Sequence, residues 1–542
     1  MSSNKNRARG SLFFKISLRG TTALLKTKGV RFDATLVAPI VLWVCIFPDV
    51  AFAQNVASDG NAPTNSAFGA VLAESTPVRT APSADTDSTA VVSGESESSS
   101  AQNTGPQTQQ TQPAKEAQTS SQEPPRRALP APLDGIFPSS EYFGPTPPVG
   151  VPDTDPVYPL EKALYSVFPS LQRAKIKIYG WANPGLDFST SSNSNIPESY
   201  AIVPNRIELD QAILRFERVP DSVQTEHVDW GFRFTTLYGI DYRWTTSQGW
   251  FSGQLLHHNY LYGIDPVEVY GLIYFPHVAQ GMIIKFGRYI SPPDIEAQLA
   301  PDNFLFTHSL MFTEDCYTQT GINAQVKLND YWSVLFGIHA GDDVAPWNPA
   351  AHNPTGMAFV RWVSHSNNDS VYVGIDSING GRFRAGHDNL QQDNLTYTHR
   401  FNKTGTFFTS TEAYYIYQSG ALVGGTVNTG PPRPWFTGVG PGNYIPGNSP
   451  AIGFVNYTEW KFAKNDFLSV RPLDILVDEK GERTGFATTY ESWTVGVTHR
   501  FLGGLISLRP EVRYEYAYSA KPYDNGTSNH QLMFAGDAIL RF

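Results

Sequence analysis

Few residues of this 542-residue chain have the types and spacing that could support chemistry. His257 and His258 are adjacent, and adjacent residues of a strand point to opposite faces, so the pair cannot chelate a metal ion from one face. Glu314-Asp315-Cys316 could supply carboxylate and thiolate ligands, but an acidic loop is the simpler interpretation. The G-x-S-x-G and H-E-x-x-H motifs are absent. We therefore expect no enzyme activity, no metal and no cofactor.

The two cysteines exclude a disulfide-stapled scaffold and a multi-cysteine zinc site. Cys45 lies in an apolar N-terminal segment that we expect to be removed, which leaves Cys316 alone. In an exported protein, a single thiol of this kind is best interpreted as a buried apolar residue.

The composition indicates strands with one apolar and one polar face. Charged residues make up 17% of the chain, below the roughly 25% of soluble proteins, and aromatic residues make up 13%. The mean hydropathy of −0.28 excludes a bundle of transmembrane helices. The net charge of −10 argues against a protein that binds nucleic acid.

The first 53 residues have the pattern of an export signal. Eight basic residues precede Asp33 without an intervening acidic residue. The apolar run 34–47 follows, and its 14 residues are too few to span a bilayer, which needs about 20. Ala51 and Ala53 flank Phe52 in a cleavage site of the A-x-A type. We expect residues 1–53 to be a signal peptide.

Residues 54–157 are rich in Ser, Thr, Gln, Pro and Ala and poor in bulky apolar residues. Such a segment cannot bury enough surface to offset its ordering entropy, so we expect a disordered periplasmic linker. A tether or a contact with the cell wall is the alternative. Residues 158–172 should form a short helix or connector, with a helix over 159–168 that has Pro at its first turn.

From Arg173 to the C-terminus the hydropathy pattern has a period of two residues, which is typical of strands with opposed faces. In residues 506–518 one parity is mainly apolar and the other carries Ser and charged residues. The first set is Ile506, Leu508, Val512, Tyr514, Tyr516 and Tyr518, and the second is Ser507, Arg509, Glu511, Arg513 and Glu515. Residues 490–501 and 229–238 alternate in the same way.

The connections between the strands alternate between short and long. We expect short turns at 220–227, 276–280, 329–330, 367–369, 403–405, 465–466 and 503–504. We expect long loops at 191–205, 239–265, 291–316, 342–354, 381–389, 419–450, 473–483 and 519–529. Residues 173–542 should therefore form an all-β transmembrane antiparallel up-and-down β-barrel of about 16 strands (14–18). The apolar parity switches near Gln211, which a β-bulge would explain.

The C-terminal sequence FAGDAILRF adds a separate signal. Phe534, Leu540 and the terminal Phe542 fall on one parity of a strand. This ending resembles the C-terminal β-signal of bacterial outer-membrane proteins, which the barrel-assembly machinery reads. We expect the last strand to close the barrel, because an open edge in lipid leaves backbone groups unsatisfied.

Several stretches resemble the OmpL-like family of outer-membrane β-barrel porins. They are YGWANPGLDFST (179–190), ELDQAILRFERVPD (208–221), DWGFRFTTLYGIDYRWTT (229–246), GRYISPPDIEAQLAPDN (287–303) and GDDVAPW (341–347). The resemblance covers roughly 175–542 and implies a pore for small hydrophilic solutes in the outer membrane of a Gram-negative bacterium. It supplies no catalytic residues. Homotrimers are usual for 16-stranded porins, so the resemblance also implies this assembly.

The third long loop, 291–316, is the candidate constriction of such a pore. It is rich in Pro and apolar residues and has no Lys or Arg, and its acidic residues are Asp294, Glu296, Asp302, Glu314 and Asp315. We expect it to fold inward, with a cap on the mouth or a subunit contact as the alternatives. A basic wall facing it could contain Arg233, Lys285, Arg361, Arg509, Arg513 and Arg541. Acid opposite base would orient dipolar solutes, and the net charge suggests weak cation preference.

Three functions remain open at this stage. The first is a porin for passive diffusion of small solutes and ions. The second is a channel dedicated to a substrate such as a sugar or organic acid, with Trp244, Trp435 and Phe436 as a stacking track. The third is a structural, adhesive or lipid-modifying barrel outside transport. All three place the chain in the bacterial outer membrane, with outer-membrane lipid as a partner.

Overall fold

The computed structural model describes residues 149–150, 157–197, 200–252, 255, 258, 260–292, 295–314, 316–348, 354–378, 390–421, 423, 444–482 and 484–542. All of them belong to one compact unit, Pro124–Phe542. The expected signal peptide, with Ala51 and Ala53, lies outside the described residues, as does nearly all of the expected linker. Both stay predictions. None of the described helices is long and apolar enough to cross a membrane.

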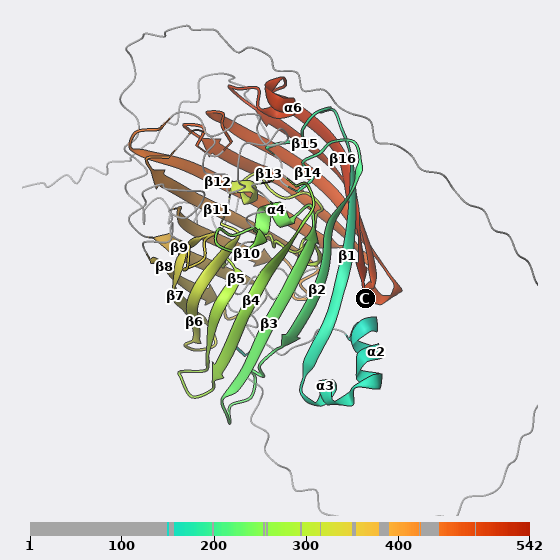
Figure 1. The fold of residues 1–542 in the computed structure, drawn as a ribbon, viewed down its shortest axis with the longest axis vertical. Helices are drawn as coiled ribbons and strands as arrows, with labels where there is room; N and C mark the ends of the chain where they lie inside the picture. The colour runs from blue at the N-terminus through green and yellow to red at the C-terminus, as the bar shows by residue number, and fades with distance from the viewer. Residues whose placement is uncertain are drawn as a thin grey trace, which may run out of the picture. The chain divides into compact units, whose positions relative to one another are not determined.

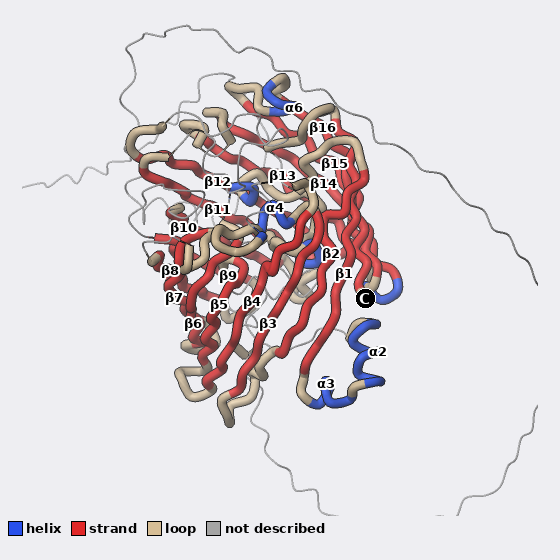
Figure 2. Tube along the Cα trace, viewed as in Figure 1, coloured by secondary structure: helices blue, strands red, loops and turns tan. Residues whose placement is uncertain are grey.

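Sixteen antiparallel strands of the described chain close into one barrel, in which consecutive strands pair and β16 pairs with β1 (Figures 1 and 2). This confirms the predicted fold class and strand number. The strands are β1 (Ile176–Ser189), β2 (Ile207–Arg218), β3 (Asp229–Gly239), β4 (Gly263–Phe275), β5 (Met282–Ile290), β6 (Thr318–Lys327), β7 (Trp332–Asp342), β8 (Thr355–Val363), β9 (Asp369–Ile378), β10 (Gln391–Arg400), β11 (Phe407–Ser419), β12 (Asn448–Lys461), β13 (Asp466–Asp478), β14 (Thr488–Phe501), β15 (Ile506–Ala517) and β16 (His530–Arg541).

The two faces of the strands differ as the period-two pattern predicts. Trp493 and Leu508 are exposed on the outer face, whereas Thr494 and Arg509 on the other parity are buried. Because successive side chains of a strand point to opposite faces, the apolar set surrounds the barrel and the polar set faces its interior. The interior is thus lined by the residues that could act on a solute.

Irregular pairing occurs at the strand positions where the sequence pattern breaks. The β1–β2 register shifts between Asn183 and Pro184, opposite Gln211, which confirms the predicted bulge. The loop predicted at 473–483 was wrong at its start, because β13 continues to Asp478. Pro472 lies at a register shift between Arg471 and Asp474, where a proline without an N–H is tolerated inside a strand.

Short helices flank or interrupt the barrel. α2 (Pro159–Val167) begins with Pro, and the Glu161 carboxylate accepts the N–H of Tyr158 at 3.4 Å, which caps its first turn. α3 (Pro169–Arg173) follows, and both helices lie at the lower end of β1 in Figure 1. The remaining short helices are α4 (Tyr242–Thr245), η3 (Ala300–Asp302), η4 (Phe312–Glu314), η5 (Leu502–Gly504) and α6 (Tyr523–Gly526).

The β1–β16 ladder closes the seam between the first and last strands, and Phe542 extends it by one residue pair. The N–H of Phe542 donates to the carbonyl of Gly180 at 2.9 Å, and Gly180 returns a bond of 3.2 Å. A Cβ on Gly180 would lie 2.9 Å from the Phe542 ring, so glycine lets the ring approach. Phe534, Leu540 and Phe542 are exposed on the outer face, and their recognition by the assembly machinery stays a prediction.

We predict that Gly287→Ala destabilises the barrel by about 1–3 kcal/mol. Gly287 in β5 has a φ of 129°, and a Cβ would lie 2.3 Å from the carbonyl oxygen of Val269 on β4. Samples of the refolded protein are heated to different temperatures and run on a detergent gel without boiling. The measurement is the temperature at which the fast-migrating, folded band disappears. Gly356→Ala is the control, because its Cβ would meet Ile378 at an ordinary 3.6 Å. Equal shifts in both variants would contradict the steric explanation.

Candidate functional site

The connection between β5 and β6, residues 291–317, lies against the interior face of the barrel, and we call it the inner loop. The N–H of Ile295 donates to Glu412 of β11 at 3.0 Å. The N–H of Leu310 donates to Asp474 of β13 at 3.0 Å. Since these wall residues are buried on the interior parity of their strands, the described part of the loop occupies space inside the barrel.

Three buried arginines of the wall donate to carbonyl groups of the inner loop. Nη1 of Arg509 donates to the carbonyls of Ala300, Asn303 and Leu305 at 2.9, 2.8 and 3.0 Å. Arg471 donates to the carbonyl of Thr307 at 2.9 Å, and Arg513 donates to that of His308. Irregular backbone away from water needs such partners, and the fork of an arginine offers five donors.

Carboxylates of the same wall complete this network. Glu511 accepts the N–H groups of Phe306 and Thr307 at 2.7 and 3.2 Å. Asp537 accepts Nε of Arg509 at 2.8 Å, across the β15–β16 pair. The wall therefore supplies both donors and acceptors, and its charges are balanced where the loop is attached.

The acidic residues of the inner loop differ in burial and in hydrogen bonding, and only some of them are described. Glu296 is buried and accepts the N–H of Ser309 at 2.8 Å and the hydroxyl of Tyr457 at 2.6 Å. Burial raises the pKa of this carboxyl, although Arg471 acts in the opposite direction. Asp302 is half-buried at the end of η3. Asp294, Asp315 and the side chain of Glu314 lie outside the described residues.

His308 of the inner loop is an interior packing residue that the sequence analysis did not single out. Its ring stacks between Tyr200 and Phe312, with centroids 4.1 and 4.4 Å away. Burial, together with the arginines of the wall, lowers the pKa of the imidazole well below its ordinary value, so it is neutral. Only a pattern linking residue 200 to residue 308 could have revealed this contact.

The six basic residues proposed for a wall opposite the loop lie in different parts of the barrel. Arg509 and Arg513 hold the loop, as described above. Arg233 pairs with Glu217 at 2.8 Å and with Glu268 at 3.2 Å. The other three follow. Lys285 lies over the rings of Tyr270 and Tyr289, Arg361 is buried, and Arg541 donates to the hydroxyl of Tyr158 at 2.6 Å.

Cys316 belongs to a buried cluster with carboxylates that are distant in sequence. Its Sγ and carboxylate oxygens of Asp342 and Asp376 all lie within 4.8 Å of one another. The amide nitrogen of Gln319 lies 3.8 Å from Sγ, 3.3 Å from Asp342 Oδ1 and 3.0 Å from Asp376 Oδ2. In this arrangement an amide donor contacts all three groups. The pair His257-His258 cannot be placed, because His257 lies outside the described residues.

The proposed aromatic track is not open to a solute in its described part. Trp244 is buried, and its ring packs 5.6 Å from that of Tyr200 and 6.2 Å from that of Tyr317. Trp435 and Phe436 lie outside the described residues. Trp244 therefore packs the interior near the inner loop.

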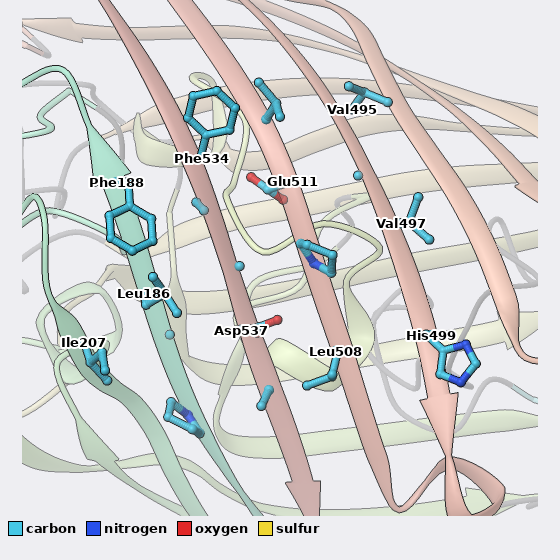
Figure 3. A pocket seen from close by; sticks show the side chains of 18 residues that line it. Leu186, Phe188, Ile207, Val495, Val497, His499, Leu508, Glu511, Phe534 and Asp537 are labelled. Carbon is cyan, nitrogen blue, oxygen red and sulfur yellow. The ribbon is translucent and has the colours of Figure 1, made fainter.

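An apolar depression of about 900 Å³ lies on the outer face, across β14, β15, β16 and β1 (Figure 3). Leu186, Phe188 and Phe534 stand at it, and Pro510 and Gly536 line it as well. Because this face belongs to the apolar exterior of the barrel, the depression is suited to contact with lipid rather than with a hydrophilic solute.

The comparisons with known proteins concern the barrel region. The model of the family described as "Putative beta-barrel porin-2, OmpL-like" matches residues 175–542. No curated protein is similar enough to count as a match. Among solved structures, the outer membrane channel DcaP of Acinetobacter baumannii is 10% identical, with 68% of this chain and 97% of that chain covered and a TM-score of 0.40.

Two further solved structures show similar values. OmpT of Vibrio cholerae, in its trimer form, is 10% identical, with 68% of this chain and 99% of that chain covered and a TM-score of 0.42. OprB of Pseudomonas putida is 10% identical, with 69% and 96% covered and a TM-score of 0.43.

We predict that Arg471→Met lowers the free energy that holds the inner loop on the wall by about 3–5 kcal/mol. The reason is that Asp474 and Glu296 lose a buried cation 3.5 and 3.6 Å away. Chymotrypsin should then cut within 291–317 faster than in the unmodified protein, while the strands stay protected. Arg218→Met is the control, since Arg218 pairs with Asp229 beyond the loop contacts. Equal cleavage rates in the unmodified protein and a folded Arg471→Met barrel would show that Arg471 does not hold the inner loop.

We also predict a pH effect at Asp241, in the connection between β3 and β4. Burial raises the pKa of its carboxyl to about 8, although the hydrogen bond from Gln211 (2.8 Å) lowers it. The folded chain therefore holds a proton that the unfolded chain loses near pH 4, and stability falls as the pH rises from about 4 to about 8. Asp241→Asn should match the unmodified protein at pH 4 and unfold at a higher temperature at pH 8.5.

The exposed turn residue Glu226 supplies the control for this pH effect. Glu226→Gln should leave the unfolding temperatures at both pH values close to those of the unmodified protein. If Asp241→Asn changes them no more than Glu226→Gln does, the buried carboxyl is not the cause.

Proposed function

The chain belongs to the OmpL-like family of β-barrel porins, and from this premise we propose that it forms a water-filled outer-membrane channel for passive diffusion of small hydrophilic solutes and ions. In this proposal the inner loop narrows the channel. The family and the fold are those of channels rather than enzymes.

The observation that carries this proposal is the opposed character of the two barrel faces. Trp230, Phe286 and Phe336 are exposed on the outside, as contact with lipid requires. Gln325 and Arg361, which are buried on interior-facing positions of their strands, show that the polar parity faces inward. A closed barrel with this polarity has its hydrophilic path inside.

The charge of the barrel region suggests the ion that the channel would favour. Residues 173–542 contain 27 Lys and Arg residues against 35 Asp and Glu residues, a net of −8. A barrel region of net negative charge attracts cations and repels anions, so we propose a weak cation preference. Asp302, half-buried at the end of η3, is the described acidic loop residue that we propose to tune this preference.

The surroundings of the barrel complete the proposal. The family implies an outer-membrane location. We propose export by the signal peptide 1–53, a periplasmic position for the segment that follows, and insertion by the barrel-assembly machinery. Outer-membrane lipid would contact the apolar exterior, and a homotrimer is the assembly we propose.

A channel dedicated to one solute class is the second candidate. The hydroxyls of Tyr270 and Tyr372, on the interior wall of β4–β9, have no hydrogen-bond partner among the described residues. Aromatic rings with such hydroxyls suit a sugar, which stacks and hydrogen-bonds at once, provided that the sugar displaces the groups that bury them. Saturable block of the ion current by a sugar would favour this candidate over passive diffusion.

The first test is the single-channel conductance of the refolded mature chain in a planar bilayer, with a salt gradient. We expect stable ohmic steps and mild cation preference. Asp302→Asn should reduce that preference, whereas Glu226→Gln at an exposed turn should not. A folded barrel that gives no steps, or one that prefers anions, would overturn the proposal.

A further inference from the structure

The interior wall of β4–β9 carries an apolar patch, which is unexpected in a water-filled barrel. Its members, all buried, are Tyr270, Leu272, Tyr274, Ile283, Tyr289, Leu335, Met357, Phe359 and Tyr372. They do not belong to the lipid-facing set, because Phe286, Phe336 and Val360 on the other parity are exposed. Apolar side chains on an interior wall are costly when they face water, so this patch needs a cover.

Val149 provides part of that cover. Its side chain is 1% exposed and packs within the same cluster, although residue 149 precedes the first strand by more than twenty positions. The N–H of Gly150 donates to the hydroxyl of Ser222 at 3.2 Å, and both groups are buried. Ser222 lies in the short connection between β2 and β3, so the contact is made at the end of the barrel where the short turns lie.

The chain is described again at Val157 and Tyr158, on a different part of the wall. The ring of Tyr158 lies 5.1 Å from that of Tyr179 on β1, and its hydroxyl accepts a bond from Arg541 of β16. Val157, in contrast to Val149, is 58% exposed. Tyr158 is eight positions after Gly150, and eight residue steps can span at most about 28 Å, which allows the two attachments to lie on separate strands.

We propose that the interior wall of β4–β9 is a docking surface for this chain's own N-terminal segment, which is seated there through Val149 and Gly150. The stretch at Val149 and Gly150 would then be held on the interior wall, as the point where the periplasmic segment enters the barrel. The occupant is intramolecular, because Gly150 and Tyr158 attach the same stretch of chain to two sites of one barrel. The effect of this docking on conduction rests on the proposed channel function.

The docking itself is tested by thiol accessibility in the refolded mature chain. Val149→Cys should react with a bulky, membrane-impermeant maleimide at least about tenfold more slowly than Val157→Cys, which is the difference expected from burying one such side chain. Cys316 is buried, so its own reaction with the maleimide gives the same background rate in both variants. Adding Leu335→Ala to the wall should speed the reaction at position 149 and leave position 157 unchanged. Equal rates at 149 and 157 would overturn the proposal.

The consequence for the lumen is tested by conductance. Val149→Asp should give larger unit steps than the unmodified protein, because a charged side chain does not stay on an apolar wall, whereas Val157→Asp should give unchanged steps. Unchanged steps in Val149→Asp would overturn the lumen position. If no variant gives steps but Val149→Cys is protected, the docking stands and the channel function fails.

Discussion

Backbone hydrogen bonding inside a membrane is the constraint on which the whole structure depends. A strand in lipid has no water to satisfy its N–H and carbonyl groups, so sixteen strands pair in a closed ring and no edge is left. The same requirement extends to the inner loop, whose irregular backbone cannot pair as a strand. Arg509 and Glu511 of the wall take that role by offering donors and acceptors to successive loop residues.

Because wall arginines and carboxylates hold the inner loop, its position depends on the charges of the wall. Each arginine that serves the loop is itself matched by a carboxylate, as Arg509 is by Asp537. A buried charge without a partner is expensive, so the attachment can be changed only by exchanging several residues together. The wall of β11–β16 is therefore structural where it holds the inner loop.

The sequence was sufficient for the barrel and insufficient for most of the site. The period-two alternation identified the strands because lipid and water impose opposite demands on successive residues, and even the bulge near Gln211 was visible as a change of parity. Arg471 was missed because its partners Thr307 and Thr494 are distant in the sequence. The contacts of Cys316 with Asp376, and of Val149 with the interior wall, join residues far apart in the chain, so no local pattern reports them.

The seam between β1 and β16 has a consequence for the order of folding. Asn183 and Asp537, which are bonded across it, are 354 positions apart in the chain. Pairing over such a separation requires closure of a very long loop, which is slow and is compensated only when the remaining contacts exist. The chain also cannot complete its ring before β16 is available to pair with β1. Until that moment the two terminal strands present unpaired edges, and the nascent protein needs protection from aggregation on its way to the membrane.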